Sequence, residues 1–255
     1  MKLFDATLDL AAFAKGTEDY TVTSVNGQTL VCSELSGRAS EFGGGTIWIR
    51  TGEAAGSFGK IESNAAQTIT IKDNFNVAAG DEITIGAWLE FDTQKLINAV
   101  NSVLRTYKIM KCNDELQLDP EKEYYELPEG VSTDIRRVLI RNKCGSYTSH
   151  YWRMEDRKLH LYDRHNWRDK EAEIILHYAD YHGAVGKEDE ISSQVDPVYL
   201  RYMSWLYLCR NLLQTVHKDN LVASDMYNEA KIYERDYGRL PNKSLQLKSM
   251  TFPQW

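Results

Sequence analysis

The stretch from Asp92 to Cys112 most constrains what this chain can fold into, because it separates two regions of strand-like sequence. Its apolar residues follow one another at steps of one or three, which places them on one face of a 3.6-residue helix. They are Leu96, Ile97, Val100, Val103, Leu104 and Tyr107. Asp92 or Thr93 suits the N-cap, and Lys108 and Lys111 are expected in the last turn, where the helix dipole favours cations. Such a helix is stable only against a partner, so the sequence predicts a second packed helix.

The region before this helix, Thr17 to Phe91, changes to a period of two and predicts short strands separated by Gly or Asn. The predicted strands are Tyr20–Val25, Thr29–Cys32, Thr46–Arg50, Gly59–Ser63, Thr68–Lys72 and Glu82–Ile85. Asn26-Gly27 is a strong hairpin signal. Short strands at this spacing are typical of a small antiparallel barrel or sandwich. In front of them, residues 1–16 predict a short helix with Leu3, Phe4, Leu8 and Ala11 or Ala12 on one side.

A second strand-rich region follows the central helix. An acidic segment, Asn113–Gly130, carries seven Asp or Glu residues and a single basic residue, Lys122. The predicted strands that come after it are Ile135–Arg141, Ser149–Arg153, Lys158–Tyr162 and Glu173–Tyr178. We therefore expect a second small β-sheet, inserted at about 113–185.

Asp196-Pro197 opens the predicted partner helix, with Asp as the cap and Pro at the first helical position. From Val198 to Val216 this helix is apolar on nearly every side, which predicts burial all round. Another helix is expected over Leu221–Tyr237, and residues 238–255 form an extended C-terminal arm. The predicted fold class is α+β: a helical bundle over 92–237, a β barrel or sandwich over 17–91, and the inserted sheet.

Composition and motifs argue against several function classes. The 255 residues carry a net charge of −7, which disfavours a generally basic nucleic-acid binder. Asp5 and Asp9 interrupt the first apolar run, so no secretory signal is expected, and no run is long enough to span a membrane. The four cysteines lack a CxxC pair, and no catalytic or phosphate-loop motif is present. We therefore expect no enzyme activity, no cofactor and no metal site.

One segment, Ile135–Lys170, is locally basic, with ten Lys or Arg residues against four acids. Aromatic residues are interleaved with them: Tyr147, Tyr151, Trp152, Tyr162 and Trp167. This composition suits contact with a phosphate backbone, and equally a solvated face or one that meets the acidic patch of a neighbouring copy. The sequence leaves these alternatives open.

The order of several motifs resembles the head–tail connector (adaptor or neck) proteins of tailed bacteriophages. The resemblance covers the chain from about Gly45 to Tyr237 and includes no catalytic signature. Its four pieces are Gly45–Ile49 with the turns and strands up to Glu82, the helix Leu96–Arg105, Tyr125–Val131 with Ile135–Val138, and Asp196–Leu200 leading into Leu212-Leu213.

The resemblance implies a structural virion protein that folds in the host cytoplasm and resides in the neck. Such proteins assemble as a ring of about twelve copies beneath the portal, continue the channel for double-stranded DNA without reading its sequence, and carry a stopper or tail. The C-terminal segment is then expected to dock on the portal or on a neighbouring subunit. The corresponding candidate interface residues are Arg239, Lys243, Lys248, Phe252 and Trp255.

Two other functions are compatible with the sequence. A tail or baseplate accessory module that contacts host glycans would use its aromatic residues, with Trp48 or Trp88 as candidates. An enzyme would require a deep pocket on which His150, His160 or Asp163 converge.

Overall fold

A computed structural model gives the fold of the chain. The structure describes residues 1–14, 17–35, 41–86, 92–141, 145, 147–162 and 172–215, together with residues 228, 231, 232 and 235. The described residues form two compact units, one from Met1–Tyr107 together with those from Gly183 to position 235, and one from Lys108–His182. We refer to them as unit 1 and unit 2.

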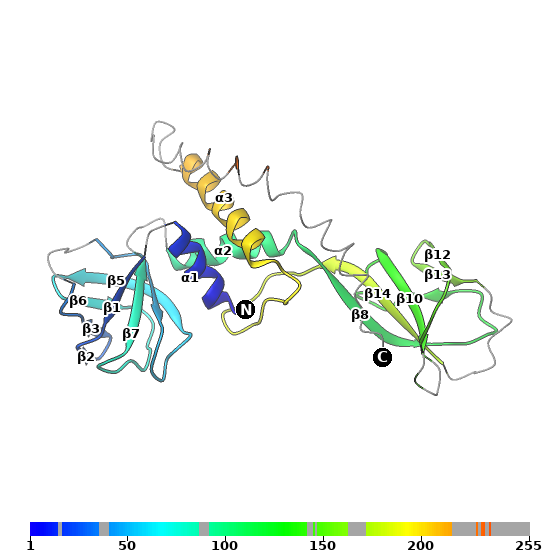
Figure 1. The fold of residues 1–255 in the computed structure, drawn as a ribbon, viewed down its shortest axis with the longest axis horizontal. Helices are drawn as coiled ribbons and strands as arrows, with labels where there is room; N and C mark the ends of the chain where they lie inside the picture. The colour runs from blue at the N-terminus through cyan, green and yellow to red at the C-terminus, as the bar shows by residue number, and fades with distance from the viewer. Residues whose placement is uncertain are drawn as a thin grey trace. The chain divides into compact units, whose positions relative to one another are not determined.

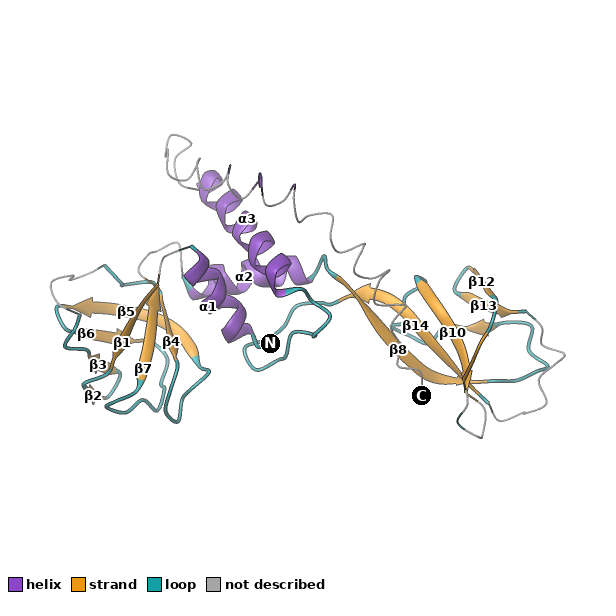
Figure 2. Cartoon of the chain, viewed as in Figure 1, coloured by secondary structure: helices purple, strands orange, loops and turns teal. Residues whose placement is uncertain are grey.

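The predicted fold class is wrong: the protein is mostly β, with 39% strand and 22% helix, and it is not a helical bundle with added β modules. Strands occur in both units, whereas the labelled helices all belong to unit 1 (Figure 2). The central helix is shorter than predicted, and most of the sequence on both sides of it forms strands. The predicted helix over Leu221–Tyr237 and the arm lie outside the described residues, apart from four helical positions at 228, 231, 232 and 235.

Unit 1 contains one antiparallel sheet of seven strands that curls into a half-barrel, rather than a closed barrel or a sandwich (Figure 1). The strand order is β1-β7-β4-β5-β6-β3-β2. The strands are β1 (Thr17–Thr21), β2 (Ser24–Asn26), β3 (Thr29–Val31), β4 (Thr46–Ile49), β5 (Phe58–Ala65), β6 (Thr68–Ile71) and β7 (Glu82–Gly86). The predicted hairpin at Asn26-Gly27 is confirmed, because Asn26 pairs with Thr29 and Gly27 takes a φ of 60°.

A cluster of Ile, Leu and Val side chains fills the concave side of this sheet, with Phe42 and Cys32 among them. Alternation explains it: in β6, Ile69 and Ile71 are buried while Thr68 and Thr70 are half-buried. Gly45 directly precedes β4, and glycine is required there because a Cβ atom would collide with the carbonyl oxygen of Gly86.

The helices of unit 1 are α1 (Leu3–Phe13), α2 (Thr93–Leu104) and α3 (Pro197–Thr215), and all three pack against one another. The prediction that α2 packs on the helix opened by Pro197 is confirmed, with the rings of Tyr107 and Tyr199 5.3 Å apart. Asp196 caps α3 as expected, accepting from the amide of Val198 at 2.8 Å. Most of α3 up to Cys209 is at least half-buried, but Val198 is 38% exposed, so burial is not complete all round.

The buried face of α1 differs from the predicted one. Leu3 and Ala11 are buried as expected, but Leu8 is only partly buried, and the centre of the face is Ala6, Thr7 and Leu10. A hydrogen bond determines this orientation, because the Thr7 hydroxyl accepts from the indole Nε1 of buried Trp48 at 3.1 Å. On the other side of α1, Asp9 accepts two bonds from Arg201 of α3, at 2.6 and 2.7 Å.

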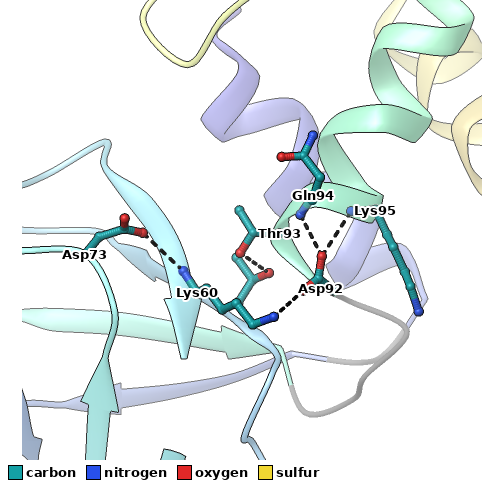
Figure 3. Close-up of polar contacts among 7 residues, drawn as sticks. Lys60, Asp73, Asp92, Thr93, Gln94 and Lys95 are labelled. Carbon is teal, nitrogen blue, oxygen red and sulfur yellow. Dashed lines mark hydrogen bonds and ion pairs between the residues drawn. The ribbon is translucent and has the colours of Figure 1, made fainter. Parts of the chain in front are cut away.

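The start of α2 is joined to the curled sheet by polar contacts (Figure 3). Asp92 caps the helix by accepting from the amides of Gln94 and Lys95, and its other oxygen accepts from Lys60 Nζ of β5 at 3.0 Å. Beside it, the hydroxyls of Thr46 and Thr93 lie 3.0 Å apart and are buried. The N-cap prediction is therefore confirmed, and the cap also acts as an anchor to the sheet.

The end of α2 corrects the prediction. The helix ends at Leu104, and Lys108 and Lys111 lie not in its last turn but in strand β8 (Lys108–Gln117) of unit 2. Each lysine pairs with a carboxylate of the same unit: Lys108 with Asp134 at 3.0 Å and Lys111 with Asp180 at 2.7 Å. Pairing with strand β14 has overridden the helical pattern of this local sequence.

Unit 2 has two antiparallel sheets where one was predicted. The four-stranded sheet has the order β11-β10-β14-β8, and the three-stranded sheet has the order β12-β13-β9. The strands besides β8 are β9 (Tyr125–Glu126), β10 (Ile135–Arg141), β11 (Tyr147–Ser149), β12 (Trp152–Glu155), β13 (Lys158–Leu161) and β14 (Glu173–Tyr181). The predicted strand Ser149–Arg153 is split between β11 and β12, which belong to different sheets. Leu, Ile and Val side chains from both sheets form one core.

We predict that Asn101→Ala destabilises the protein by about 2–4 kcal/mol. The buried Asn101 amide donates to the Val185 carbonyl at 3.0 Å and accepts from the Val185 amide at 2.8 Å, so truncation leaves two buried backbone groups unpaired. Urea denaturation measures the effect. Asn98→Ala, on the exposed face of the same helix, is the matched control and should change the free energy of unfolding by less than about 0.7 kcal/mol.

We further predict an acid-sensitive contribution from Asp92. Burial raises the pKa of Asp92, but the bonds from Lys60, Gln94 and Lys95 outweigh it and hold the pKa below the ordinary 3.8. The unfolded state therefore binds the proton more tightly, so the stabilisation is complete above about pH 4 and is lost as pH falls through the folded-state pKa. Melting temperatures of wild type and Asp92→Asn, measured from pH 2.5 to 7, should differ most near neutral pH and converge in acid. A constant difference over the whole range would contradict this.

Candidate interaction surface

The five candidate interface residues of the arm, Arg239, Lys243, Lys248, Phe252 and Trp255, all lie outside the described residues, so their role stays a prediction. Of the locally basic segment Ile135–Lys170, the structure describes mainly strands β10 to β13.

The three-stranded sheet of unit 2 has one face in the core and one outer face. In β12 and β13, Trp152, Met154, Leu159 and Leu161 contribute to the core. The alternate residues of the same strands therefore lie on the outer face. We call this outer face the platform; its residues are Tyr124, Tyr151, Arg153, Glu155, Lys158, His160 and Tyr162.

Among the described residues, the exposed tyrosines all lie in unit 2. Tyr151 is 82% exposed, and the adjacent Tyr162, whose amide donates to the Tyr151 carbonyl at 3.1 Å, is 48% exposed. Tyr124, 38% exposed, lies under Lys158 Nζ at 4.3 Å and beside the His160 ring at 5.9 Å. Tyr147 and Tyr181 are exposed elsewhere in the unit. Exposed aromatic residues with a polar group are typical of protein interfaces.

The charges on and near the platform are largely paired within unit 2. Glu155 lies 3.0 Å from Arg153 and 3.6 Å from His160. In the four-stranded sheet Arg141 pairs with Glu173 and Arg136 with Asp134. Arg136 and Lys108 together hold the pKa of Asp134 below its ordinary value, although burial opposes them. Such pairing weakens the case for a phosphate-binding face, because Arg136, Arg141 and Arg153 already have carboxylate partners.

The acidic segment forms a hollow next to the second half of β8. The hollow has a volume of about 690 Å³, and Glu115, Lys122, Glu123, Tyr124 and Glu126 are among its lining residues. A smaller hollow of about 390 Å³ is lined by Leu118, Asp119, Pro120 and Glu121. The Tyr125 hydroxyl stabilises this segment by donating to the Asp119 carbonyl at 2.7 Å. Carboxylates thus surround an open space with a single lysine among them.

The residues predicted for the alternative functions do not converge. Trp48 is fully buried, so it cannot contact a glycan, and Trp88 and Asp163 lie outside the described residues. His160 pairs with Glu155, whereas His150 lies 3.0 Å from the Thr148 hydroxyl. Among the described residues, no group of His, Cys, Asp or Glu is arranged to hold a metal ion, and none of the described helices is long and apolar enough to cross a membrane.

The described cysteines are Cys32, Cys112 and Cys209, all as free thiols. Burial, with a contribution from Glu34, raises the pKa of Cys32 to about 11, so this thiol is protonated at neutral pH and acts as a core side chain.

Comparison with known proteins adds no identification. No family model matches the chain, and no curated protein matches it significantly.

We predict that Tyr151→Ser with Tyr162→Ser changes the free energy of unfolding by less than about 1 kcal/mol, because both rings are exposed. Leu159→Ala, whose side chain points from the same sheet into the core, should cost about 2–5 kcal/mol. Urea denaturation of the two variants makes the comparison. A double-tyrosine variant as unstable as Leu159→Ala would show that the rings support the fold and are not an interaction surface.

Proposed function

We propose that this chain is a ring subunit of the head–tail connector of a tailed bacteriophage, a structural protein of the virion neck. In this role about twelve copies join the portal to a stopper or tail and continue the channel for double-stranded DNA. The subunit would fold in the host cytoplasm before it joins the virion.

The observation that carries the proposal is the pairing of α2 with α3. The segments Leu96–Arg105 and Asp196–Leu213 are two of the four that resemble connector proteins, and they pack together although the whole of unit 2 lies between them in the chain. Hydrogen bonds hold the chain that leads into α3 beside α2: the Tyr107 hydroxyl donates to the Gln194 carbonyl at 3.2 Å, and Asn101 bonds to Val185. A rigid helical element with an inserted β unit suits a subunit that must hold neighbours on several sides.

Two further features support a conduit. A net charge of −7 per subunit lowers attraction to passing phosphates. Three arginines of unit 2, Arg136, Arg141 and Arg153, have carboxylate partners, so they are poorly placed to bind DNA. The exposed tyrosines of the platform instead suit contact with a neighbouring protein.

Mass photometry of the purified chain, alone and with its portal protein, tests the proposal. We expect a complex whose mass corresponds to about twelve chains on one portal ring. A portal from an unrelated phage is the control and should recruit no chains. A strict monomer that binds neither portal at any concentration would contradict the proposal.

A glycan array separates the connector from a glycan-binding tail or baseplate module. With Trp48 buried, the exposed aromatic residues that the structure describes, and that are available to a sugar, are the tyrosines of unit 2. A saturable sugar signal that disappears in the Tyr151→Ser, Tyr162→Ser variant would favour the glycan-binding module.

A further inference from the structure

The second half of β8 is an exposed sheet edge. In the four-stranded sheet β8 is an end strand that pairs with β14, and among the described residues no strand lies along its other side. Within Asn113–Gln117, the side chains of Asp114, Glu115 and Gln117 are exposed, and the other two are half-buried. A sheet edge offers backbone donors and acceptors to an added strand.

The hollow lies alongside this edge. Glu115, Leu116 and Gln117 form one part of its lining, and the segment Lys122–Glu126 forms the other. The side chains of a strand added to this edge would therefore find space in the hollow. Tyr124 provides aromatic surface there, and Glu115, Glu123 and Glu126 provide negative charge.

The charge of this groove is unbalanced. Asn113–Gly130 carries seven carboxylates and one lysine. The ion pairs of Lys108, Lys111, Arg141 and Arg153 are with acids outside this segment, which are Asp134, Asp180, Glu173 and Glu155. An occupant that brings two or three cations and no carboxylate would neutralise it.

One segment of this chain has that composition. The arm Arg239–Trp255 contains Arg239, Lys243 and Lys248, and no Asp or Glu. Between its two prolines, Lys243–Phe252 has no proline, so every residue of that stretch has a backbone N–H to donate to a neighbouring strand. Phe252 and Trp255 add aromatic rings for the tyrosine-lined side of the groove.

We propose that the arm Arg239–Trp255 of a second copy binds as an added strand along Asn113–Gln117, with Lys243 or Lys248 among the carboxylates of the hollow. A contact between different elements of two copies is heterologous, and repeated around a rotation axis it closes a ring. The inference rests on the proposed connector function only in requiring a second copy.

Carbodiimide cross-linking of the full-length chain tests this contact without any mutation, because the reagent joins an amine directly to a carboxylate. Chains labelled with ¹⁵N and unlabelled chains are assembled together, with and without portal, and the linked peptides are analysed by mass spectrometry. We expect links from Lys243 or Lys248 to Glu115, Glu123 or Glu126 in mixed heavy–light pairs. Links that never mix isotopes place the arm on its own copy, and they overturn the proposal, as does the absence of such links.

Charge reversal provides the second measurement. Glu115→Lys with Glu123→Lys should weaken self-association by about tenfold or more, and Lys243→Glu with Lys248→Glu should restore it in the combined variant. Glu62→Lys, on an exposed position of β5, is the matched control and should leave association unchanged. Circular dichroism confirms that each variant is folded. Unchanged association in the reversed variant would overturn the proposal.

The two proposals fail separately. Mixed-isotope links in a chain that never binds portal would keep the arm contact and remove the connector function. A portal-bound ring without links between the arm and the groove would keep the connector function and remove the arm contact.

Discussion

The paired hydrogen bonds between Asn101 and Val185 join two parts of unit 1 that are 84 residues apart in the chain. Because the site is buried, both partners are needed, and neither finds water as a substitute. The bonds fix the returning chain beside α2, from which it reaches Asp196 and starts α3 against the same helix. Tyr107 reinforces this closure through Gln194 and its ring contact with Tyr199. The helix pair on which the functional proposal depends is thus specified by polar contacts as well as by apolar packing.

A second polar junction connects the helices to the curled sheet. Asp92 both caps α2 and accepts from Lys60, and Thr7 on α1 accepts from Trp48 inside the sheet layer. Directional bonds of this kind select one packing of a helix on a sheet from many that bury similar apolar area. The same requirement explains why Trp48 is unavailable for ligand binding despite its aromatic character.

Local patterns in the sequence predict the elements with strong local signals. The Asn26-Gly27 hairpin, the caps at Asp92 and Asp196, and strand β10 all follow from turn chemistry, side-chain capping and β-branched alternation. The pairing of α2 with α3 also follows, since two apolar helices without other partners require each other. The sequence patterns overestimate the amount of helix and underestimate the amount of strand, so the predicted fold class is wrong.

The wrong predictions share one physical cause. Contacts between residues far apart in the chain determine these features, and a local sequence pattern does not contain them. Lys108–Gln117 lacks clean alternation and continues an amphipathic helix, so only hydrogen bonding to β14 makes it a strand. The face of α1 depends on Thr7 meeting Trp48, 41 residues later. The hollow beside Glu115 was visible in the sequence only as an acidic run, because a hollow needs the neighbouring segment to be placed. The sequence indicated the basic and aromatic composition of the platform. Which of its residues lie on the outer face follows only from the strand register.

The register between β8 and β14 has a consequence for how this architecture arises. Lys108 is opposite Tyr181, so the chain enters and leaves unit 2 on adjacent antiparallel strands. An insertion whose ends already meet can be lost or gained in evolution by a single exchange of a surface loop, without rethreading the host fold. Unit 2 therefore has the geometry of an inserted domain, which a short turn between Tyr107 and Gly183 could replace without changing the path of the chain through unit 1.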